Sequence, residues 1–306
     1  MKEIYFAGGC FWGTEHFFSG VDGVVSVVSG YAQGNPGFAG QPSYEQVYTD
    51  TTGFAETVRV TYCPERITLD TLTDLFFSII DPLSINRQGH DEGTRYRTGV
   101  YYRDAADLPV LEAAFARATE RAGQPIVVEL EPLRNFFEAE EKHQKYLDKN
   151  PDGYCHLPWK VFKYLRLYQD VTALLSDEPD LIARMAETAA LIYERMKFFW
   201  VGFYIVRGTE LVLGPFQGPP ACLRIGYGRG VCGTAWKEAR TVVVPDVEKF
   251  PGHIACSSLS RSEIVVPFMS GTARPQVCAV LDIDSTSPAT FDATDALWLE
   301  KIIGLI

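Results

Sequence analysis

The first half of the chain alternates short β-rich stretches with stretches in which apolar residues recur at helical spacing. The predicted strands are residues 2–7, 24–28, 57–62, 98–102 and 126–130. The predicted helices are residues 11–18, 68–80, 107–122 and 137–148. Residues 30–43 and 81–97 are polar or rich in Gly, Pro and Gln, which is typical of loops. A predicted turn at residues 150–155 ends this half.

The same kind of pattern starts again near residue 166. A long predicted helix covers residues 169–197, with a break near Pro179. The predicted strands that follow are residues 199–206, 210–213, 241–244, 263–268 and 277–283. A glycine-rich stretch, residues 226–233, leads into a short helix, and a last helix begins near Thr294. We therefore expect two domains, residues 1–165 and 166–306.

Length and composition agree with two globular domains. The chain has 306 residues, of which 46% are hydrophobic and 22% charged, as in an ordinary globular protein. Its net charge of −11 disfavours binding to nucleic acid or to anionic membranes. No apolar run approaches the ~20 residues of a membrane span. The first seven residues are too short an apolar stretch for a secretory signal, so we expect a cytoplasmic location.

Seven cysteines are spread over both halves. An odd number in a reducing compartment argues against a structural disulfide framework. The sequence has no C-x-x-C pair, which argues against a zinc ribbon or a thioredoxin-like site. The cysteines are therefore buried structural thiols, catalytic thiols, or both. Cys63, at a strand end, and Cys278, inside a strand, are expected to be structural.

Cys10 lies where the first strand turns into the first helix, directly after two glycines. Backbone N–H groups at a helix N-terminus stabilise a thiolate, which is one way to activate a cysteine as a nucleophile. Phe11 and Trp12 could form an apolar wall beside it. From this local pattern alone, a small buried cysteine and a nucleophile both remain open.

Several motifs at defined spacings in the first half can together be compared with known protein families. They are Gly9-Cys10-Phe11-Trp12-Gly13, Gly30-Tyr31, Pro42-Ser43-Tyr44, Thr52-Gly53-Phe54-Ala55-Glu56, Asn86-Arg87-Gln88-Gly89, Asp91-x-Gly93-Thr94-x-Tyr96-Arg97 and Lys149-Asn150-Pro151-x-Gly153-Tyr154-Cys155. In this order, over about residues 3–160, they resemble the peptide-methionine (S)-S-oxide reductases. Phe54, Ile80 and Gln41 depart from that family, which usually has His, His and Asn there. These departures leave substrate preference and rate open.

The resemblance implies an α+β fold with a mixed sheet and a role for each motif. Cys10 would attack the sulfur of methionine sulfoxide, and Cys155 would resolve the resulting sulfenic acid as a disulfide. Glu56 would bond or protonate the sulfoxide oxygen, which requires a site that raises the pKa of this carboxyl. The residues implied in substrate binding are Phe11, Trp12, Tyr44, Asp91 and Tyr96.

In the second half, Cys222, Cys232 and Cys256 together with His253 suggest a zinc site, but metal ligands usually come in closer pairs. The stretch Gly228-Arg229-Gly230 lacks the Lys-Ser/Thr of a phosphate-binding Walker motif. The motifs here are Leu213-Gly214-Pro215-Phe216-Gln217-Gly218, Ala221-Cys222-x-Arg224-Ile225, Gly228-Arg229-Gly230-Val231-Cys232-Gly233-Thr234-Ala235, Gly252-His253-Ile254-Ala255-Cys256, Ser262-Glu263-Ile264-Val265 and Leu281-Asp282-Ile283-Asp284-Ser285. They resemble the free methionine (R)-sulfoxide reductases.

That second resemblance implies a GAF-like domain with a central antiparallel sheet and an enclosed pocket. Cys256 would be the nucleophile and Cys222 the resolving thiol, although Cys232 remains an alternative partner. Glu263, Asp282 and Asp284 would line the pocket, where clustered carboxyls share protons because they cannot all ionise together. Trp200 could pack on the substrate methyl, or simply belong to the core.

Methionine oxidation gives two sulfur epimers, and each needs its own reductase. The two resemblances together imply a bifunctional enzyme that acts on free methionine sulfoxide and on oxidised protein methionines. Electrons would come from a thioredoxin-like reductant, and no cofactor or metal is expected. The alternatives are a second half that is a GAF redox or ligand sensor without catalysis, a thiol-rich metal-binding protein, and a general thiol peroxidase.

Overall fold

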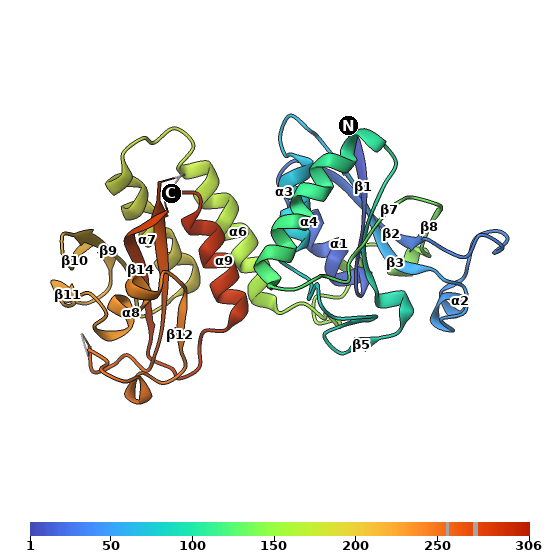
Figure 1. Cartoon of the computed structure of the whole chain (residues 1–306). Helices are drawn as coiled ribbons and strands as arrows, with labels where there is room; N and C mark the ends of the chain where they lie inside the picture. Colours follow the sequence, from blue (N-terminus) through green and yellow to red (C-terminus); the bar gives the residue numbers. More distant parts are fainter. Residues whose placement is uncertain (255–256, 272–274) are drawn as a thin grey trace. The chain divides into compact units, whose positions relative to one another are not determined.

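The computed structural model (Figure 1) describes residues 1–254, 257–271 and 275–306. Its contacts divide the chain into two compact units, Met1–Phe162 and Lys163–Ile306. Cys256 lies outside the described residues. Among the described helices, none combines the length and apolar character of a membrane span.

The first unit is built on a mixed six-stranded sheet in the order β7-β6-β1-β3-β2-β8. Only β6 and β7 are parallel, and the other neighbours are antiparallel. The sheet strands are β1 (Lys2–Gly8), β2 (Val24–Ala32), β3 (Ala55–Tyr62), β6 (Thr98–Tyr102), β7 (Glu129–Pro132) and β8 (Phe136–Glu138), and a separate pair is β4 (Arg87–Gln88) and β5 (Asp91–Glu92). The helices are α1 (Phe11–Ser19), α2 (Tyr44–Tyr48), α3 (Leu69–Phe76), α4 (Leu108–Ala122) and α5 (Tyr146–Lys149), with one-turn 3-10 helices η1 (Thr94–Tyr96), η2 (Ala105–Asp107) and η3 (Glu141–His143).

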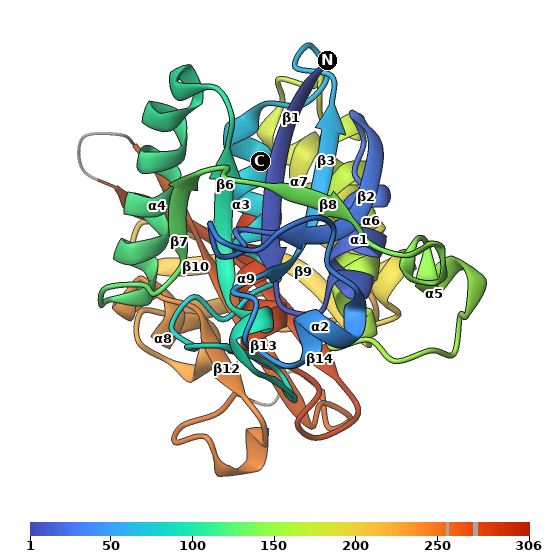
Figure 2. The ribbon, with the colours of Figure 1, turned by 90° about the vertical axis from the view of Figure 1, so that its right-hand side faces the viewer.

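The central strand β1 is buried on both faces. On one face, the Phe6 ring stacks on Phe18 of α1 and Phe76 of α3, with ring centroids 4.8 Å apart in each pair. On the other face, Tyr5 belongs to a second apolar cluster, against which Leu133 packs. Figure 2 shows the chain between β7 and β8, which contains Leu133, crossing this face of the sheet. Burial on both faces makes β1 a rigid support for the residues that follow it.

The predicted helix at residues 137–148 is wrong. Phe136–Glu138 instead forms the edge strand β8 beside β2, with Tyr31 opposite Phe137. Further on, Gln144 accepts a hydrogen bond from the backbone N–H of Ser29 and donates one to its carbonyl, and Lys145 has a left-handed backbone (φ 50°). Tertiary contacts therefore override a helix-favouring local sequence, and only the short helices η3 and α5 form in this segment. The structure also places β7 three residues later than predicted, and adds the short helix α2, which begins with a Ser43 capping box.

Gly30 has no room for a side chain. A Cβ atom there would lie 2.4 Å from the Phe136 ring and 2.5 Å from the backbone oxygen of Phe137. We expect Gly30→Ala to push β8 away from β2 and to lower the free energy of unfolding by about 1–3 kcal/mol. Gly37→Ala is the matched control, because nothing lies within 4 Å of its Cβ position. Denaturant unfolding measures both, and equal stability of the two variants would contradict this account of β8.

The second unit is built on a six-stranded antiparallel sheet in the order β11-β10-β9-β14-β13-β12. Its strands are β9 (Trp200–Arg207), β10 (Glu210–Gln217), β11 (Arg224–Gly226), β12 (Val242–Val244), β13 (Ser262–Ser270) and β14 (Gln276–Ser285). Its helices are α6 (Trp159–Leu174, which begins before the boundary of the unit), α7 (Leu181–Met196), α8 (Gly230–Glu238) and α9 (Ala293–Ile303), with the 3-10 helix η4 (Val247–Lys249). The predicted break near Pro179 is confirmed, whereas β11 was not predicted and the helix expected from residue 169 begins ten residues earlier.

Helix α8 lies against one face of this sheet and contributes Val231, Cys232 and Ala235 to a buried cluster with Tyr204 of β9. The glycine-rich stretch before α8 allows the backbone to pack closely. A Cβ atom on Gly233 would lie 2.5 Å from the carbonyl oxygen of Gly226, and the N–H of Gly228 donates to the Gly233 carbonyl. The loop therefore folds onto the start of α8 and fixes Cys232 in its first turn.

Candidate active site

The topology of the first sheet brings three predicted site residues to one end of β1. Since β1 is antiparallel to both neighbours, Phe6 lies opposite Val58 of β3, and Gly8 lies opposite Thr98 of β6. The end of β1 that leads to Cys10 is therefore beside the start of β3, which carries Glu56. It is also beside the start of β6, which follows Tyr96. Residues 10, 56 and 96 are far apart in sequence but meet at one edge.

Cys10 precedes the first residue of α1 and is buried, with 5% of its surface exposed. Burial raises the pKa of its thiol well above the usual value, and the nearby Glu56 carboxylate adds to this. The Trp12 backbone N–H acts in the opposite direction. The predicted effect of the helix N-terminus is therefore present but smaller than the effect of burial, and Cys10 rests as a thiol.

Glu56 is buried, and its Oε2 accepts a hydrogen bond of 3.0 Å from the Phe11 backbone N–H. Burial raises its pKa to about 8, against the opposing effects of this hydrogen bond and of the Arg95 guanidinium. The side chain therefore holds a proton at neutral pH, as a proton donor here must. While Glu56 is neutral, it does not repel a Cys10 thiolate.

Two tyrosines and an aspartate surround this pair. Burial, with help from Glu56, raises the pKa of Tyr44 to about 12 and raises that of Tyr96 as well, so both keep their hydroxyl protons. Arg95 stacks over the Tyr96 ring at 4.5 Å. Burial also raises the pKa of Asp91. Its Oδ2 is buried without a hydrogen-bond partner among the described residues.

Phe11 and Trp12, which were predicted to form an aromatic wall, differ in their burial and in the rings that they contact. Phe11 is buried, and its ring contacts Tyr31 and His143. Trp12 is only half-buried, stacks on Tyr146 at 3.7 Å and donates its indole N–H to His143 Nδ1 at 3.3 Å. His143 is a site neighbour that the sequence analysis missed, because no local motif marks it.

Cys155 lies in the loop after α5, against the first turn of α1. A Cβ atom on Gly13 would lie 3.2 Å from its Sγ. Both Cys10 and Cys155 are free thiols in this structure. Burial raises the pKa of the Cys155 thiol. Cys155 therefore lies beside the helical turn that Cys10 begins, close to Gly13, which is three residues after Cys10.

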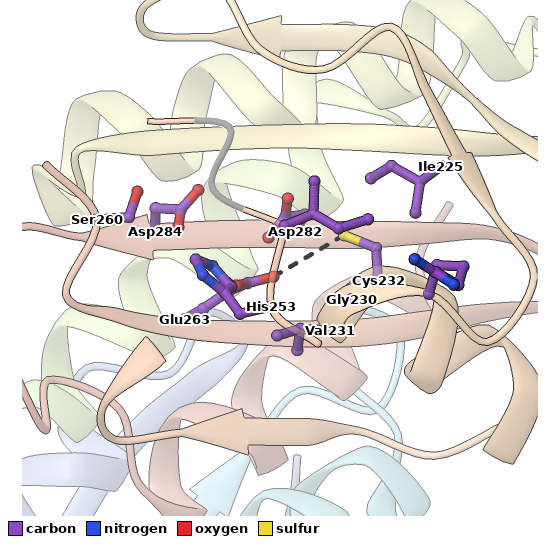
Figure 3. Close-up of a pocket in the computed structure, with 11 residues that line it drawn as sticks. Ile225, Gly230, Val231, Cys232, His253, Ser260, Glu263, Asp282 and Asp284 are labelled. Atoms are coloured by element: carbon purple, nitrogen blue, oxygen red, sulfur yellow. Dashed lines mark hydrogen bonds and ion pairs between the residues drawn. The ribbon is translucent and has the colours of Figure 1, made fainter. Parts of the chain in front are cut away.

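The second unit gathers a cysteine and three carboxyls around one pocket (Figure 3). Asp282 and Asp284 point to the same face of β14, and Glu263 of β13 lies directly opposite Asp284. Cys232 Sγ is 3.9 Å from Glu263 Oε1, and His253 Nε2 is 3.7 Å from Glu263 Oε2. The lining residues are Ile225, Arg229, Gly230, Val231, Cys232, His253, Ile254, Ser260, Glu263, Asp282 and Asp284.

These carboxyls cannot all ionise at neutral pH. Burial and the neighbouring aspartates raise the pKa of Glu263 well above its usual value, and burial and Asp284 do the same for Asp282. Burial raises the pKa of Asp284 to about 6. The cluster therefore holds at least one proton and at least one negative charge near pH 7.

The remaining predicted residues of this unit surround the pocket less directly. Cys222 is half-buried and disulfide-bonded, and its carbonyl accepts a hydrogen bond from the Tyr204 hydroxyl. Cys232 is a free thiol whose pKa is raised by burial and by Asp282. Trp200 packs on Tyr204 and Phe216 and donates its indole N–H to the Pro219 carbonyl. It is not among the described residues that line the pocket, so its contact with a substrate stays a prediction.

Comparison with known proteins assigns each half separately. The family profile described as peptide methionine sulfoxide reductase matches residues 2–172, and the GAF domain profile matches residues 180–306. The peptide methionine sulfoxide reductase MsrA of Clostridium acetobutylicum is 51% identical over 163 residues, which are 53% of this chain and 99% of that protein.

The solved structures that are similar to the second half include the following two. The free methionine-R-sulfoxide reductase of Neisseria meningitidis, in complex with its substrate, is 51% identical and covers 46% of this chain and 84% of its own, with a TM-score of 0.45. A putative GAF sensor protein of Burkholderia vietnamiensis is 46% identical and covers 48% of this chain and 93% of its own, with a TM-score of 0.46. Because one profile matches more than half of its length and a curated relative is covered almost completely, the chain belongs to the peptide methionine sulfoxide reductase family, and its second half is a GAF domain.

Proposed function

We propose that the chain is a bifunctional, thiol-dependent reductase of methionine sulfoxide. Its first domain (residues 1–165) would reduce the S epimer, free or in proteins, and its second (residues 166–306) the R epimer of the free amino acid. One observation carries this proposal: each half buries a carboxyl that holds a proton at neutral pH next to a cysteine. Glu56 lies beside the proposed nucleophile Cys10, and Glu263 lies beside Cys232, a further cysteine of the second pocket. A protonated carboxyl polarises the sulfoxide bond for attack by a thiol.

In the first domain, Glu56 donates its proton to the sulfoxide oxygen while the Cys10 sulfur attacks the sulfoxide sulfur. Cys10 reacts as its thiolate, after it has released its proton to water. The oxygen ends on Cys10 as a sulfenic acid, the thioether leaves, and Glu56 takes a proton back from water. The hydroxyls of Tyr44 and Tyr96 help to hold the oxygen, and Asp91 orients the substrate. Phe11 and Trp12 contact the methyl group. The raised pKa values of Glu56, Tyr44 and Tyr96 support this assignment, because these three groups keep their protons at neutral pH.

The catalytic cycle then closes through a disulfide. The Cys155 thiol attacks the Cys10 sulfur, a disulfide forms, and the oxygen leaves as water. A dithiol reductant of the thioredoxin kind reduces that disulfide and restores both thiols. Because this chemistry consumes thiol reducing equivalents in every turnover, we propose that the protein acts in the cytoplasm.

In the second domain, Cys256 would attack the sulfur and Cys222 would resolve it. Cys232 is a free thiol, and we assign the resolving role to Cys222, as the resemblance to the free methionine (R)-sulfoxide reductases implies. Protonated Glu263 or Asp282 bonds the sulfoxide oxygen, and ionised Asp284 binds the α-ammonium of a free amino acid. Trp200 would pack near the methyl group.

The division of labour among these carboxyls is testable. We expect Asp284→Asn to raise the KM for the free R epimer by about 10–100-fold, because it removes the charge that binds the ammonium group. Glu263→Gln should lower kcat by a similar factor, because it removes a proton donor. Glu210→Gln is the control, since Glu210 forms only an exposed ion pair with Arg224. Steady-state kinetics on the free R epimer separates the two effects, and an unchanged KM in Asp284→Asn would contradict the assigned role.

The direct test of the proposed function is dithiol-dependent reduction of four separate substrates by the wild-type chain. They are the S and R epimers of free methionine sulfoxide and the same epimers within a short peptide. We expect turnover of both free epimers, turnover of the S epimer in the peptide, and none of the R epimer in the peptide. Lack of turnover of the free R epimer would instead favour a GAF sensor that regulates the first domain, an alternative raised by the similarity to a putative GAF sensor.

A further inference from the structure

The imidazole of His156 fills a slot that two glycines leave open on either side of Cys10. A Cβ atom on Gly9 would lie 3.5 Å from His156 Nε2. A Cβ atom on Gly13 would lie 3.0 Å from both Nδ1 and Cε1 of the same ring. The two glycines that flank the nucleophile therefore leave the space in which this ring sits.

The ring lies beside both thiols of the first domain. A ring nitrogen of His156, Cys10 Sγ and a carboxylate oxygen of Asp91 all lie within 4.8 Å of one another. Cys155 Sγ reaches the same Gly13 position as the ring, at 3.2 Å. The imidazole is thus adjacent to Cys10 and to the residue that would resolve it.

Both ring nitrogens are buried, and neither has a hydrogen-bond partner of good geometry among the described residues, although the Gly8 backbone lies close enough to affect the ring. Leaving such groups unpaired is unfavourable. Burial also lowers the pKa of the imidazole to about 4, so the ring is neutral near pH 7. A neutral imidazole has one donor and one acceptor nitrogen. It can therefore accept a proton at one nitrogen and donate a proton from the other.

We propose that His156 is the proton shuttle of the resolving step, an inference that rests on the proposed S-epimer reduction. As the Cys155 sulfur attacks the Cys10 sulfur, one ring nitrogen accepts the Cys155 thiol proton. The other gives its proton to the hydroxyl oxygen that leaves Cys10. The S–S bond forms, the S–O bond breaks and one water is released. The ring is neutral before and after.

The resolving step needs this shuttle more than the first step does. In the first step Glu56 itself supplies the proton that the reacting oxygen receives. In the resolving step the proton starts on Cys155, which lies against Gly13 of α1, whereas Glu56 is held at the Phe11 N–H. His156 follows Cys155 directly in the chain, so its ring accompanies that thiol toward Cys10.

The test follows the two steps separately in His156→Ala and His156→Asn. Reduced enzyme is mixed with excess S epimer without reductant, and methionine release, sulfenic acid trapped by a dimedone-type reagent, and disulfide are followed in time. We expect an unchanged burst of one methionine per chain and disulfide formation slowed about 100-fold, with trapped sulfenic acid in between. Free imidazole should speed disulfide formation in His156→Ala.

Controls separate a proton role from a structural one. Cys155→Ser gives the sulfenic acid that cannot be resolved, and His16→Asn removes a histidine of α1 whose partner is Asp148. Disulfide formation at the wild-type rate in both His156 variants would overturn the proposal, as would slowing that imidazoles of different pKa all leave unchanged. A wild type without any methionine burst would instead overturn the S-reductase function. One equivalent of hydrogen peroxide then makes the sulfenic acid directly, so that the His156 comparison still gives an answer.

Discussion

Cys10→Ser should abolish reduction of the S epimer and leave reduction of the free R epimer unchanged. The hydroxyl of serine at this buried position is far less nucleophilic than a thiol and cannot accept the sulfoxide oxygen as a sulfenic acid. Loss of a covalent nucleophile typically lowers kcat by about 10⁴–10⁶-fold. Dithiol-dependent assays on the separated free epimers measure both activities in one preparation.

The reciprocal variant is Cys256→Ser, at a position outside the described residues. It should abolish reduction of the R epimer alone, by a similar factor. Cys63→Ser and Cys278→Ser are matched controls, because these thiols are free and hydrogen-bond to Glu65 and to the Phe268 carbonyl rather than to a site residue. If Cys256→Ser kept full R-epimer activity, or if Cys10→Ser removed both activities, the two halves would not be independent reductases.

Residues near each other in sequence were the easiest to place. The run of apolar residues before Gly8 and Gly9, followed by apolar residues at helical spacing, was enough to predict β1, Cys10 and α1. The backbone of Gly9 has φ +81°, and a Cβ atom there would lie 2.6 Å from Gln88. The turn therefore requires glycine, and a glycine can be recognised in the sequence alone. The mixed and antiparallel sheets, implied by resemblance, are confirmed.

The segment at residues 137–148 shows what local pattern cannot reveal. Its helix-favouring residues make contacts fixed by distant parts of the chain. Glu140 accepts hydrogen bonds from the Tyr31 hydroxyl and from the Tyr44 backbone N–H. These partners lie about a hundred residues away, so no window of sequence contains both sides of the contact.

The site residues also differ in whether a local sequence motif reveals them. Glu56 was named from a motif, but its raised pKa depends on burial by the meeting of β1, β3 and α1, which only the fold supplies. His143 and His156 were not singled out, although His156 directly follows Cys155. Its importance comes from the slot between Gly9 and Gly13, two glycines that the sequence places 140 residues or more before it.

Glu56→Gln should lower the rate of S-epimer reduction by about 10²–10³-fold, because an amide can donate a hydrogen bond to the oxygen but cannot give it a proton. The pH dependence of the rate is a sharper test of Glu56 as the proton donor. The reactive form pairs protonated Glu56 with a Cys10 thiolate. Since Glu56 has a pKa of about 8 and the thiol pKa is higher, the wild-type rate should rise with pH up to about 8 and then level off. The rate of Glu56→Gln should continue to rise above pH 8, so the difference in rate between this variant and wild type becomes smaller there.

The same substitution should stabilise the fold in alkali. The pKa of Glu56 is raised on folding, so its contribution to stability is complete below about pH 4.5 and is lost as pH rises through about 8. Glutamine does not ionise and can still accept the Phe11 N–H bond. Glu56→Gln should therefore be more stable than wild type at pH 9, by a few kcal/mol at most, since one pKa unit corresponds to about 1.4 kcal/mol. The two should be alike at pH 5. Denaturant unfolding at both pH values, with exposed Glu112→Gln as the control, decides this. Equal stability at pH 9 combined with a constant activity deficit would mean that Glu56 is already ionised at neutral pH and cannot be the acid.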